Sequence, residues 1–289
     1  MNILVLGASG FIGSTFCSHA VSKGENILGM VRNEYIFHKM DFNRVLGSIE
    51  NPPWKEIREF RPDVVINFAW DVSAGNWKDS IVPENYISTY ADLFIKLFEL
   101  GVSKIIGIGS ALEYSPTSVP TDESCATITE DISYVKTKLM MLQRLMEISS
   151  SFGRKYVWIR PFYVYGETDK NPRIIPHAFK NFRNNEAVFF KNPHSTKDFI
   201  NVSDVASAVL VAATKNAEGV INVGTGIGTK ILDLAFEIAS LLNIDKSLIK
   251  YDSARTSDDT HPYLVANNEK LLSLGWEQSV TLLDGLNKM

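Results

Sequence analysis

The sequence has little cysteine and no excess of basic residues. Cys17 and Cys125 are the only cysteines in 289 residues, too few for a disulfide framework or a cysteine-built metal site. The five histidines are scattered without ligand spacing, so we expect no metal. Lysine and arginine number 29 against 33 aspartates and glutamates, and the net charge of −4 gives no indication of a nucleic-acid partner.

Long apolar runs are also missing. No run approaches the roughly 20 residues of a membrane span, and the N-terminal MNILVLGASG reaches a glycine turn too early for a signal peptide. We therefore expect a cytoplasmic protein without a membrane partner. Hydrophobic residues make up 45% and charged residues 21%, which suits one large α/β domain or a nucleotide domain with a smaller lobe.

Short apolar runs alternate with helical patterns through the first half of the chain. The runs are NILVLG, NILGMV, RVLGS, DVVINFA, KIIGIGS and KYVWIR. Helical patterns cover 11–23, 78–100 and 134–150. This alternation predicts an α/β fold with a doubly wound parallel sheet that is covered on both faces. The second and third helices are apolar enough either to pack within the chain or to face a partner subunit.

The rhythm changes after RPFYVYG. Two helical patterns, at 172–184 and 230–242, are interleaved with the runs AVFF, KDFINVSDVASAVLVAAT and GVINVG. We expect a first domain at 1–165, with returning segments near 196–224, and a smaller lobe built mainly from 166–289. No low-complexity linker or internal repeat separates the two parts.

The motif GASGFIG places Gly7, Gly10 and Gly13 between the first apolar run and the first helix. Glycines allow a tight turn and let a pyrophosphate approach the backbone, where N–H groups and the positive end of the helix bind it. The spacing is GxxGxxG rather than GxGxxG. A turn that only packs helix on strand is the alternative, but the strand–helix junction favours dinucleotide binding.

The end of the second apolar run bears on the choice of dinucleotide. Enzymes that use NAD usually have an acidic residue there, which binds the adenosine ribose. In GMVRN, Val31 stands at that place and Arg32 follows. A guanidinium can bind a 2′-phosphate with paired hydrogen bonds, so NADP(H) is favoured. NAD(H) or dual use stays open if Arg32 only points to water.

Tyr134 and Lys138 form a candidate catalytic pair because residues four apart share one face of a helix. A phenol with a pKa of about 10 is a poor acid or base at neutral pH. An adjacent ammonium and an oxidised nicotinamide would stabilise the phenolate and lower that pKa. Ser110 ends the run KIIGIGS, at the carboxyl end of a strand, where open α/β sheets bind ligands, and could hold a substrate oxygen.

Taken in order, these motifs resemble those of extended short-chain dehydrogenases/reductases of the NAD-dependent epimerase/dehydratase group, which act mostly on nucleotide-sugars. GASGFIG is similar to the family's cofactor turn, SALEY to its catalytic Ser/Thr strand and YVKTK to its YxxxK motif. RPFYVYG and KDFINVSDVA are similar to RPxNVYG and RDFxxVxDVA. The resemblance covers nearly the whole chain. It implies a Rossmann-type fold, a nucleotide-sugar substrate, a homodimer formed through 78–100 and 134–150, and a place in cell-surface polysaccharide biosynthesis.

The resemblance also implies the residues of the site. Ser110, Tyr134 and Lys138 carry over as the catalytic trio. The implied cofactor contacts are Gly7, Ser9, Gly10, Phe11, Ile12, Gly13, Arg32, Asn67, Phe68, Ala69, Tyr134, Lys138, Pro161 and Tyr163. The implied substrate contacts are Ser110, Tyr134, His177, Lys197 and Arg255.

Several of these positions depart from the family pattern. Lys197 stands where the family has a phosphate-binding arginine, and lysine lacks the arginine fork. Arg255 is either a second phosphate ligand or a solvated charge, and His177 either contacts substrate or caps a helix. Tyr163 replaces the asparagine of RPxNVYG. Trp70 replaces a small residue and either lines the sugar pocket or covers the sheet.

The neighbours of Ser110 narrow the reaction. Sugar 4,6-dehydratases of the family have an acidic pair after the catalytic Ser/Thr, whereas Ala111 and Leu112 follow here and cannot move a proton. Glu113 comes one place late and would point to the other side of an extended strand. We expect NADPH-dependent reduction of a nucleotide-linked 4-keto-6-deoxy sugar, with an NAD-retaining 4-epimerase as the alternative. A non-enzymatic dinucleotide sensor is a third hypothesis, disfavoured because the trio is complete.

Overall fold

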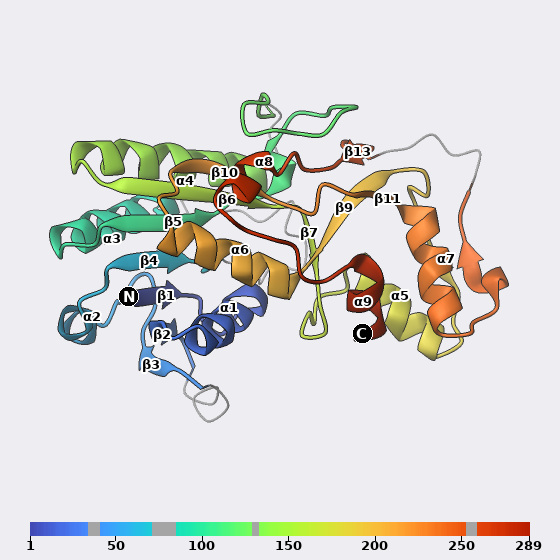
Figure 1. The fold of residues 1–289 in the computed structure, drawn as a ribbon, viewed down its shortest axis with the longest axis horizontal. Coiled ribbons are helices and arrows are strands. Elements are labelled where there is room, and N and C mark those ends of the chain that lie inside the picture. Colours follow the sequence, from blue (N-terminus) through green and yellow to red (C-terminus); the bar gives the residue numbers. More distant parts are fainter. Residues whose placement is uncertain (34–40, 71–84, 129–132, 253–258) are drawn as a thin grey trace.

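The computed structural model describes residues 1–33, 41–70, 85–128, 133–252 and 259–289. Within them, seven strands form one parallel sheet in the order β10-β6-β5-β4-β1-β2-β3 (Figure 1). These strands are β1 (Asn2–Leu6), β2 (Asn26–Val31), β3 (Asn43–Leu46), β4 (Val64–Asn67), β5 (Lys104–Ile108), β6 (Lys155–Pro161) and β10 (Gly219–Val223). The prediction of a doubly wound, Rossmann-type parallel sheet is confirmed.

Helices cover both faces of this sheet (Figure 1). On one face, α1 (Phe11–Ser22) packs against α6 (Val202–Thr214). On the other face lie α2 (Trp54–Phe60), α3 (Tyr86–Glu99) and α4 (Ser133–Ser151). The central strands are therefore buried on both sides, which requires apolar residues at successive positions rather than alternate ones.

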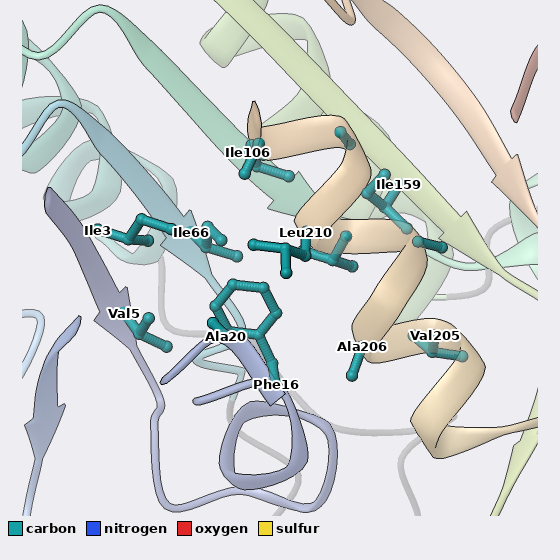
Figure 2. Packing of buried hydrophobic residues seen from close by; sticks show 14 of the residues in the cluster. Ile3, Val5, Phe16, Ala20, Ile66, Ile106, Ile159, Val205, Ala206 and Leu210 are labelled. Carbon is teal, nitrogen blue, oxygen red and sulfur yellow. The ribbon is translucent and has the colours of Figure 1, made fainter. Parts of the chain in front are cut away.

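Strand β1 shows this pattern directly. Ile3 and Val5 belong to the buried cluster under α1 and α6, whereas Leu4 and Leu6 belong to the cluster under α3 and α4. Figure 2 shows the first cluster, in which the ring of Phe16 from α1 lies among aliphatic side chains of the sheet and of α6. The continuous apolar run NILVLG thus reflects two cores that share one strand.

The sequence also explains where α3 ends. Phe94, Leu97 and Phe98 recur at helical spacing and are buried against the sheet. Gly101 then adopts a φ of 96°, a conformation that favours glycine. The N–H of Val102 donates to the carbonyl of Leu97, and that of Gly101 to the carbonyl of Phe98, which satisfies two carbonyls at the helix end.

The smaller lobe has its own sheet and its own core. In this sheet β9 (Thr196–Asn201) pairs with β7 (Tyr163–Tyr165), β11 (Gly228–Lys230) and β13 (Tyr263–Leu264). The remaining described elements beyond β6 are α5 (Ile174–Arg183), β8 (Val188–Phe189), α7 (Ile231–Leu241), a 3-10 turn (Lys246–Leu248), β12 (Ile249–Lys250), α8 (Glu269–Ser273) and α9 (Leu282–Asn287). Helices α5, α7 and α9 gather on the side of this sheet away from the main sheet (Figure 1).

The segment 196–224 divides between the two parts of the chain. Its first strand, β9, pairs within the smaller sheet, whereas α6 and β10 complete the first domain. Of the predicted helix 78–100, the structure shows α3 from Tyr86, and positions 78–84 lie outside the described residues. The other predicted long helices are present with ends shifted by at most two residues.

We expect Phe16→Ala to lower the free energy of unfolding by about 3–5 kcal/mol, because it opens a cavity between α1, α6 and the sheet. Urea unfolding followed by circular dichroism measures the loss. Phe189→Ala is the control, since Phe189 is 51% exposed, and should change stability by at most about 0.5 kcal/mol. Equal losses in the two variants would contradict this description of the core.

Candidate active site

Two glycines of GASGFIG are required by close packing. Gly7 has a φ of 76°, and a Cβ there would lie 2.6 Å from the backbone nitrogen of Ala69. A Cβ on Gly13 would lie 2.3 Å from the carbonyl oxygen of Gly7. These contacts bring the first turn of α1 tightly against the end of β1. Part of the glycine pattern therefore serves helix–strand packing.

The third glycine leaves the start of α1 open. Gly10 is the N-cap, and no side chain caps the helix. The first N–H groups of a helix have no partner within the helix, and here no acidic side chain lies in the first turn. Ser9, Phe11 and Ile12 flank these donors and are only partly buried. This arrangement fits the pyrophosphate of a dinucleotide.

The loop after β4 lies next to the glycine turn. The side-chain oxygen of Asn67 accepts a hydrogen bond from the N–H of Ala69 at 3.1 Å, and the carbonyl of Ala69 accepts one from the hydroxyl of Tyr90 at 2.9 Å. The ring of Phe68 packs on Phe16, with centroids 5.4 Å apart. Asn67, Phe68 and Ala69 are thus held at the carboxyl end of the sheet, and their contact with a cofactor stays a prediction.

Arg32 directly follows β2 and is exposed. Val31, the last residue of the strand, is buried. The residue that ends β2 therefore offers no carboxylate to a ribose, and the residue after it carries an exposed guanidinium.

The expected catalytic trio comes together at the end of β5. Ser110 begins a short 3-10 turn, Ala111–Glu113, and its hydroxyl oxygen accepts a hydrogen bond from the N–H of Leu112 at 3.2 Å. Tyr134 lies in the first turn of α4, and its side chain is hydrogen-bonded to that of Ser110. One turn later, the ammonium of Lys138 donates to the carbonyl of Ile108, the last residue of β5.

Burial dominates the electrostatics of the trio. It raises the pKa of Tyr134 to about 12; the negative charge of Glu113 adds to this increase, while Arg173 and the hydrogen bond from Ser110 oppose it. Burial lowers the pKa of Lys138 to about 7, and Glu113 opposes that decrease. We expected a lowered phenol pKa in the presence of an ammonium and an oxidised nicotinamide. In the chain without a nicotinamide the pKa is raised instead, because desolvation of Tyr134 outweighs the effects of Arg173 and Ser110.

Trp70 lines the site. Its ring lies under the ammonium of Lys138, which is 3.8 Å from the ring centroid. It also makes edge-on contacts with Tyr134 and Tyr86, with centroids 5.7 Å and 5.3 Å apart. The ring of Trp70 thus contacts Tyr134 and Lys138, and its role in lining a sugar pocket stays a prediction.

The expected substrate contacts are more dispersed. Lys197 is buried and pairs with Asp259 at 2.7 Å, and its ammonium lies 5.3 Å from the ring centroid of Tyr163. His177 is exposed on α5 and contacts Asn181 in the following turn. Arg255, the remaining expected substrate contact, lies outside the described residues. Pro161, an expected cofactor contact, is the last residue of β6.

The sequence motifs did not indicate Arg173 as part of the site, and they placed Glu113 on a strand although it lies in a 3-10 turn. Arg173 is the N-cap residue of α5, and its guanidinium lies 5.8 Å from the ring centroid of Phe11 in the glycine turn. Its side chain is 49% exposed and pairs weakly with Asp169 at 3.5 Å. In the sequence, the one indication of this role was a basic residue directly before the first helix of the smaller lobe. Glu113 does point away from the site, but from a 3-10 turn rather than a strand.

With this geometry established, the profile of the NAD dependent epimerase/dehydratase family matches residues 3–224. The chain belongs to this family. The predicted resemblance is therefore confirmed. Among the described residues no helix is long and apolar enough to cross a bilayer, and no group of three or more His, Cys, Asp or Glu side chains could hold a metal ion.

Individual relatives are distant but span the whole chain. CDP-abequose synthase of Salmonella muenchen is 23% identical, and dTDP-4-dehydro-6-deoxyglucose reductase of Escherichia coli is 25% identical. A putative UDP-glucose 4-epimerase of Methanocaldococcus jannaschii is 26% identical. Each alignment covers 99% of this chain and 96% of the relative.

Solved structures show the same fold. UDP-glucose 4-epimerase of Thermus thermophilus, in complex with NAD, superposes with a TM-score of 0.84 at 20% identity, over 99% of this chain and 97% of that one. dTDP-glucose 4,6-dehydratase of Bacillus anthracis, also with NAD, gives 0.83 at 22% identity, over 100% and 94%.

We expect Lys138→Met to stabilise the chain in the absence of cofactor at about pH 6. Burial lowers the pKa of Lys138 in the folded chain to about 7, from the 10.5 of an ordinary lysine, so below pH 7 folding must desolvate a charged ammonium. Between the two pKa values the unfolded chain binds more protons, so the cost fades as the pH rises. The advantage of the variant should accordingly shrink by about pH 9.

Urea unfolding at both pH values measures this difference. Lys136→Met is the control, because Lys136 lies on the exposed side of the same helix. A Lys138→Met variant that is less stable than the wild type at the lower pH would contradict the description of a costly buried ammonium.

Proposed function

We propose that the protein is an NADPH-dependent ketoreductase acting on a nucleotide-linked 4-keto-6-deoxy sugar. The observation that carries the proposal is the convergence of Ser110, Tyr134 and Lys138 beside the glycine turn, with Ala111 and Leu112 following the serine. The trio supports carbonyl–alcohol chemistry. The two apolar residues supply no acid or base for removing water from a hexose.

Each residue of the trio has a distinct role in this mechanism. The bound nicotinamide supplies the hydride for the C4 carbonyl carbon. Ser110 donates its hydroxyl proton in a hydrogen bond to the carbonyl oxygen, which fixes the substrate and polarises the C=O bond. Tyr134 gives its phenolic proton to that oxygen as the C4 alcohol forms. Lys138 stabilises the phenolate left behind and holds the nicotinamide ribose.

The cationic residues of the smaller lobe support binding of a nucleotide diphosphate. Arg173 has a half-exposed guanidinium close to the glycine turn, and a guanidinium can bind phosphate oxygens in pairs. Arg255 keeps the phosphate role proposed from the sequence. Lys197 is the weaker candidate, since Asp259 already neutralises its charge. We assign His177 no contact with the reacting atoms, because it faces Asn181.

The choice of NADPH is supported by Arg32, which is exposed directly after Val31, the position at which NAD enzymes usually have a carboxylate. A relative named dTDP-4-dehydro-6-deoxyglucose reductase is consistent with reduction of a keto sugar. We also propose a homodimer through α3 and α4. On α4, Met140 and Met146 are 47% and 43% exposed, which suits an apolar contact between subunits.

The second candidate is an NAD-retaining nucleotide-sugar 4-epimerase. It is favoured by relatives named UDP-glucose 4-epimerase and by the Thermus thermophilus enzyme with NAD, which shares this fold. The same trio serves both reactions. Cofactor content separates them, because an epimerase would be purified with one NAD(H) per chain and would not oxidise added NADPH.

We expect Tyr134→Phe to lower the rate of NADPH oxidation with a nucleotide-linked 4-keto-6-deoxyhexose by about 10²–10⁴-fold, because the proton donor is removed. NADPH binding, followed by the fluorescence of the reduced nicotinamide, should persist. The assay runs a panel of nucleotides and sugars, repeated with NADH. Tyr251→Phe is the control, since Tyr251 is exposed. No oxidation with any member of the panel, or full activity in Tyr134→Phe, would contradict the ketoreductase.

A further inference from the structure

A carboxylate that the mechanism does not use lies directly behind the trio. Glu113 has no exposed surface. One of its oxygens accepts a hydrogen bond from the backbone N–H of Ser110 at 2.8 Å. The other accepts from Nε of Arg160 at 2.7 Å and from the indole N–H of Trp158 at 3.0 Å. Since all three partners donate, the pocket is built for the ionised carboxylate.

The surrounding backbone is shaped to admit this group. A Cβ on Gly109 would lie 2.2 Å from the indole nitrogen of Trp158 and 2.4 Å from a carboxylate oxygen of Glu113. On the far side, the guanidinium of Arg160 lies 4.3 Å from the ring centroid of Tyr114. Burial raises the pKa of the Glu113 carboxyl, and the charge of Arg160 lowers it. A buried ion pair is weak evidence for stability, so a role in the site is the better explanation.

The hydrogen bond between the Ser110 backbone N–H and the Glu113 carboxylate helps to fix the position of the Ser110 hydroxyl. Glu113 and Ser110 form a reciprocal capping box, in which each side chain binds backbone N–H groups of the same turn. The serine oxygen accepts a hydrogen bond from the N–H of Leu112, and the Ser110 side chain is also hydrogen-bonded to Tyr134. These two contacts hold the Ser110 hydroxyl beside the phenol. Without the carboxylate, the backbone of Ser110 would lose this anchor.

The negative charge of Glu113 also acts on the other two members of the trio. Lys138 is surrounded by the carbonyl of Ile108 from β5, the rings of Trp70 and Tyr134, and the charge of Glu113. Around Tyr134, the groups that influence its ionisation are Glu113, Arg173, Ser110 and Tyr86. Glu113 raises the pKa of both Lys138 and Tyr134.

We propose that Glu113 is a positioning residue that holds the hydroxyl of Ser110 toward the substrate and keeps the ammonium of Lys138 charged during turnover. It touches neither substrate nor cofactor. The inference rests on the proposed function for the roles of the trio, but its effect on Lys138 can be measured without any turnover.

The first test is nuclear magnetic resonance of lysine labelled with ¹³C at Cε, with the Lys138 signal assigned by its loss in Lys138→Met. In the wild type we expect a titration midpoint of about 7. In Glu113→Gln the midpoint should fall, because the negative charge that favours the ammonium is gone. Glu123→Gln is the matched control: the carboxylate of Glu123 also accepts a backbone N–H, at 2.8 Å from Asn222, and its loss should leave the midpoint in place.

The second test is the pH profile of kcat/KM in the reducing direction. Loss of the Glu113 charge lowers the pKa of both proton-bearing groups, so the alkaline limb should move to lower pH in Glu113→Gln. The rate in Glu113→Gln should also fall by roughly tenfold to a hundredfold, the loss typical when a group that orients an active-site residue is removed. A uniform loss of rate with no movement of the limb would assign Glu113 a merely structural role and overturn the proposal.

Glu113→Asp keeps the charge but shortens the side chain, and it serves if Glu113→Gln does not fold. Here the Lys138 midpoint should stay near that of the wild type while kcat falls. The fall should be much smaller in a Ser110→Ala background, because both changes act through the same hydroxyl. An undiminished fall in that background would contradict positioning through Ser110. A shifted midpoint in Glu113→Gln without turnover of any sugar would support this inference and count against the proposed function alone.

Discussion

The site depends on the burial of an ammonium group at the carboxyl end of the parallel sheet. Lys138 reaches from α4 to the carbonyl of Ile108 and lies over the ring of Trp70. A buried charge costs free energy unless it is paired and hydrogen-bonded. Here a carbonyl, an aromatic face and a nearby carboxylate offset part of that cost, and the pKa of Lys138 falls to about 7. The group can therefore gain or lose its proton near neutrality.

This constraint accounts for several features around it. Helix α4 must bring Lys138 to the end of β5, and its packing on α3 and β6 in a shared apolar core holds it there. The glycines of IIGIGS leave room for Trp158 and Glu113, whose side chains occupy the space behind the serine. The same packing partly buries the tyrosine and raises the pKa of its phenol to about 12, so the phenol keeps its proton at neutral pH. Without a cofactor, the chain therefore favours the protonated phenol of Tyr134, which is the form that can donate a proton.

Much of this was predictable from residue patterns. The apolar run of β1 serves two cores, and such runs separated by helical patterns lead directly to a parallel sheet. Tyr134 and Lys138 share a helix face by spacing alone, and Ser110 follows a strand that neighbours β4. The structure brings these three together because parallel strands end at one edge of the sheet.

Other features depend on contacts that no local pattern encodes. The direction of Glu113 follows from a 3-10 turn that begins where β5 has already ended, and its partner Arg160 comes from the next strand. The pairing of Lys197 with Asp259 joins residues more than sixty positions apart, so the sequence pattern around Lys197 does not predict it. The raised pKa of Tyr134 reflects burial, which a motif cannot report.

In the proposed reduction, a hydride would pass from the nicotinamide to C4 of the sugar, with Tyr134 as the proton donor. NADPH deuterated on the transferring face of the nicotinamide C4 tests it directly, with the product sugar analysed by mass spectrometry and nuclear magnetic resonance. The account predicts one deuterium per product molecule, bound to the former carbonyl carbon at C4. Product without deuterium at that carbon would contradict it.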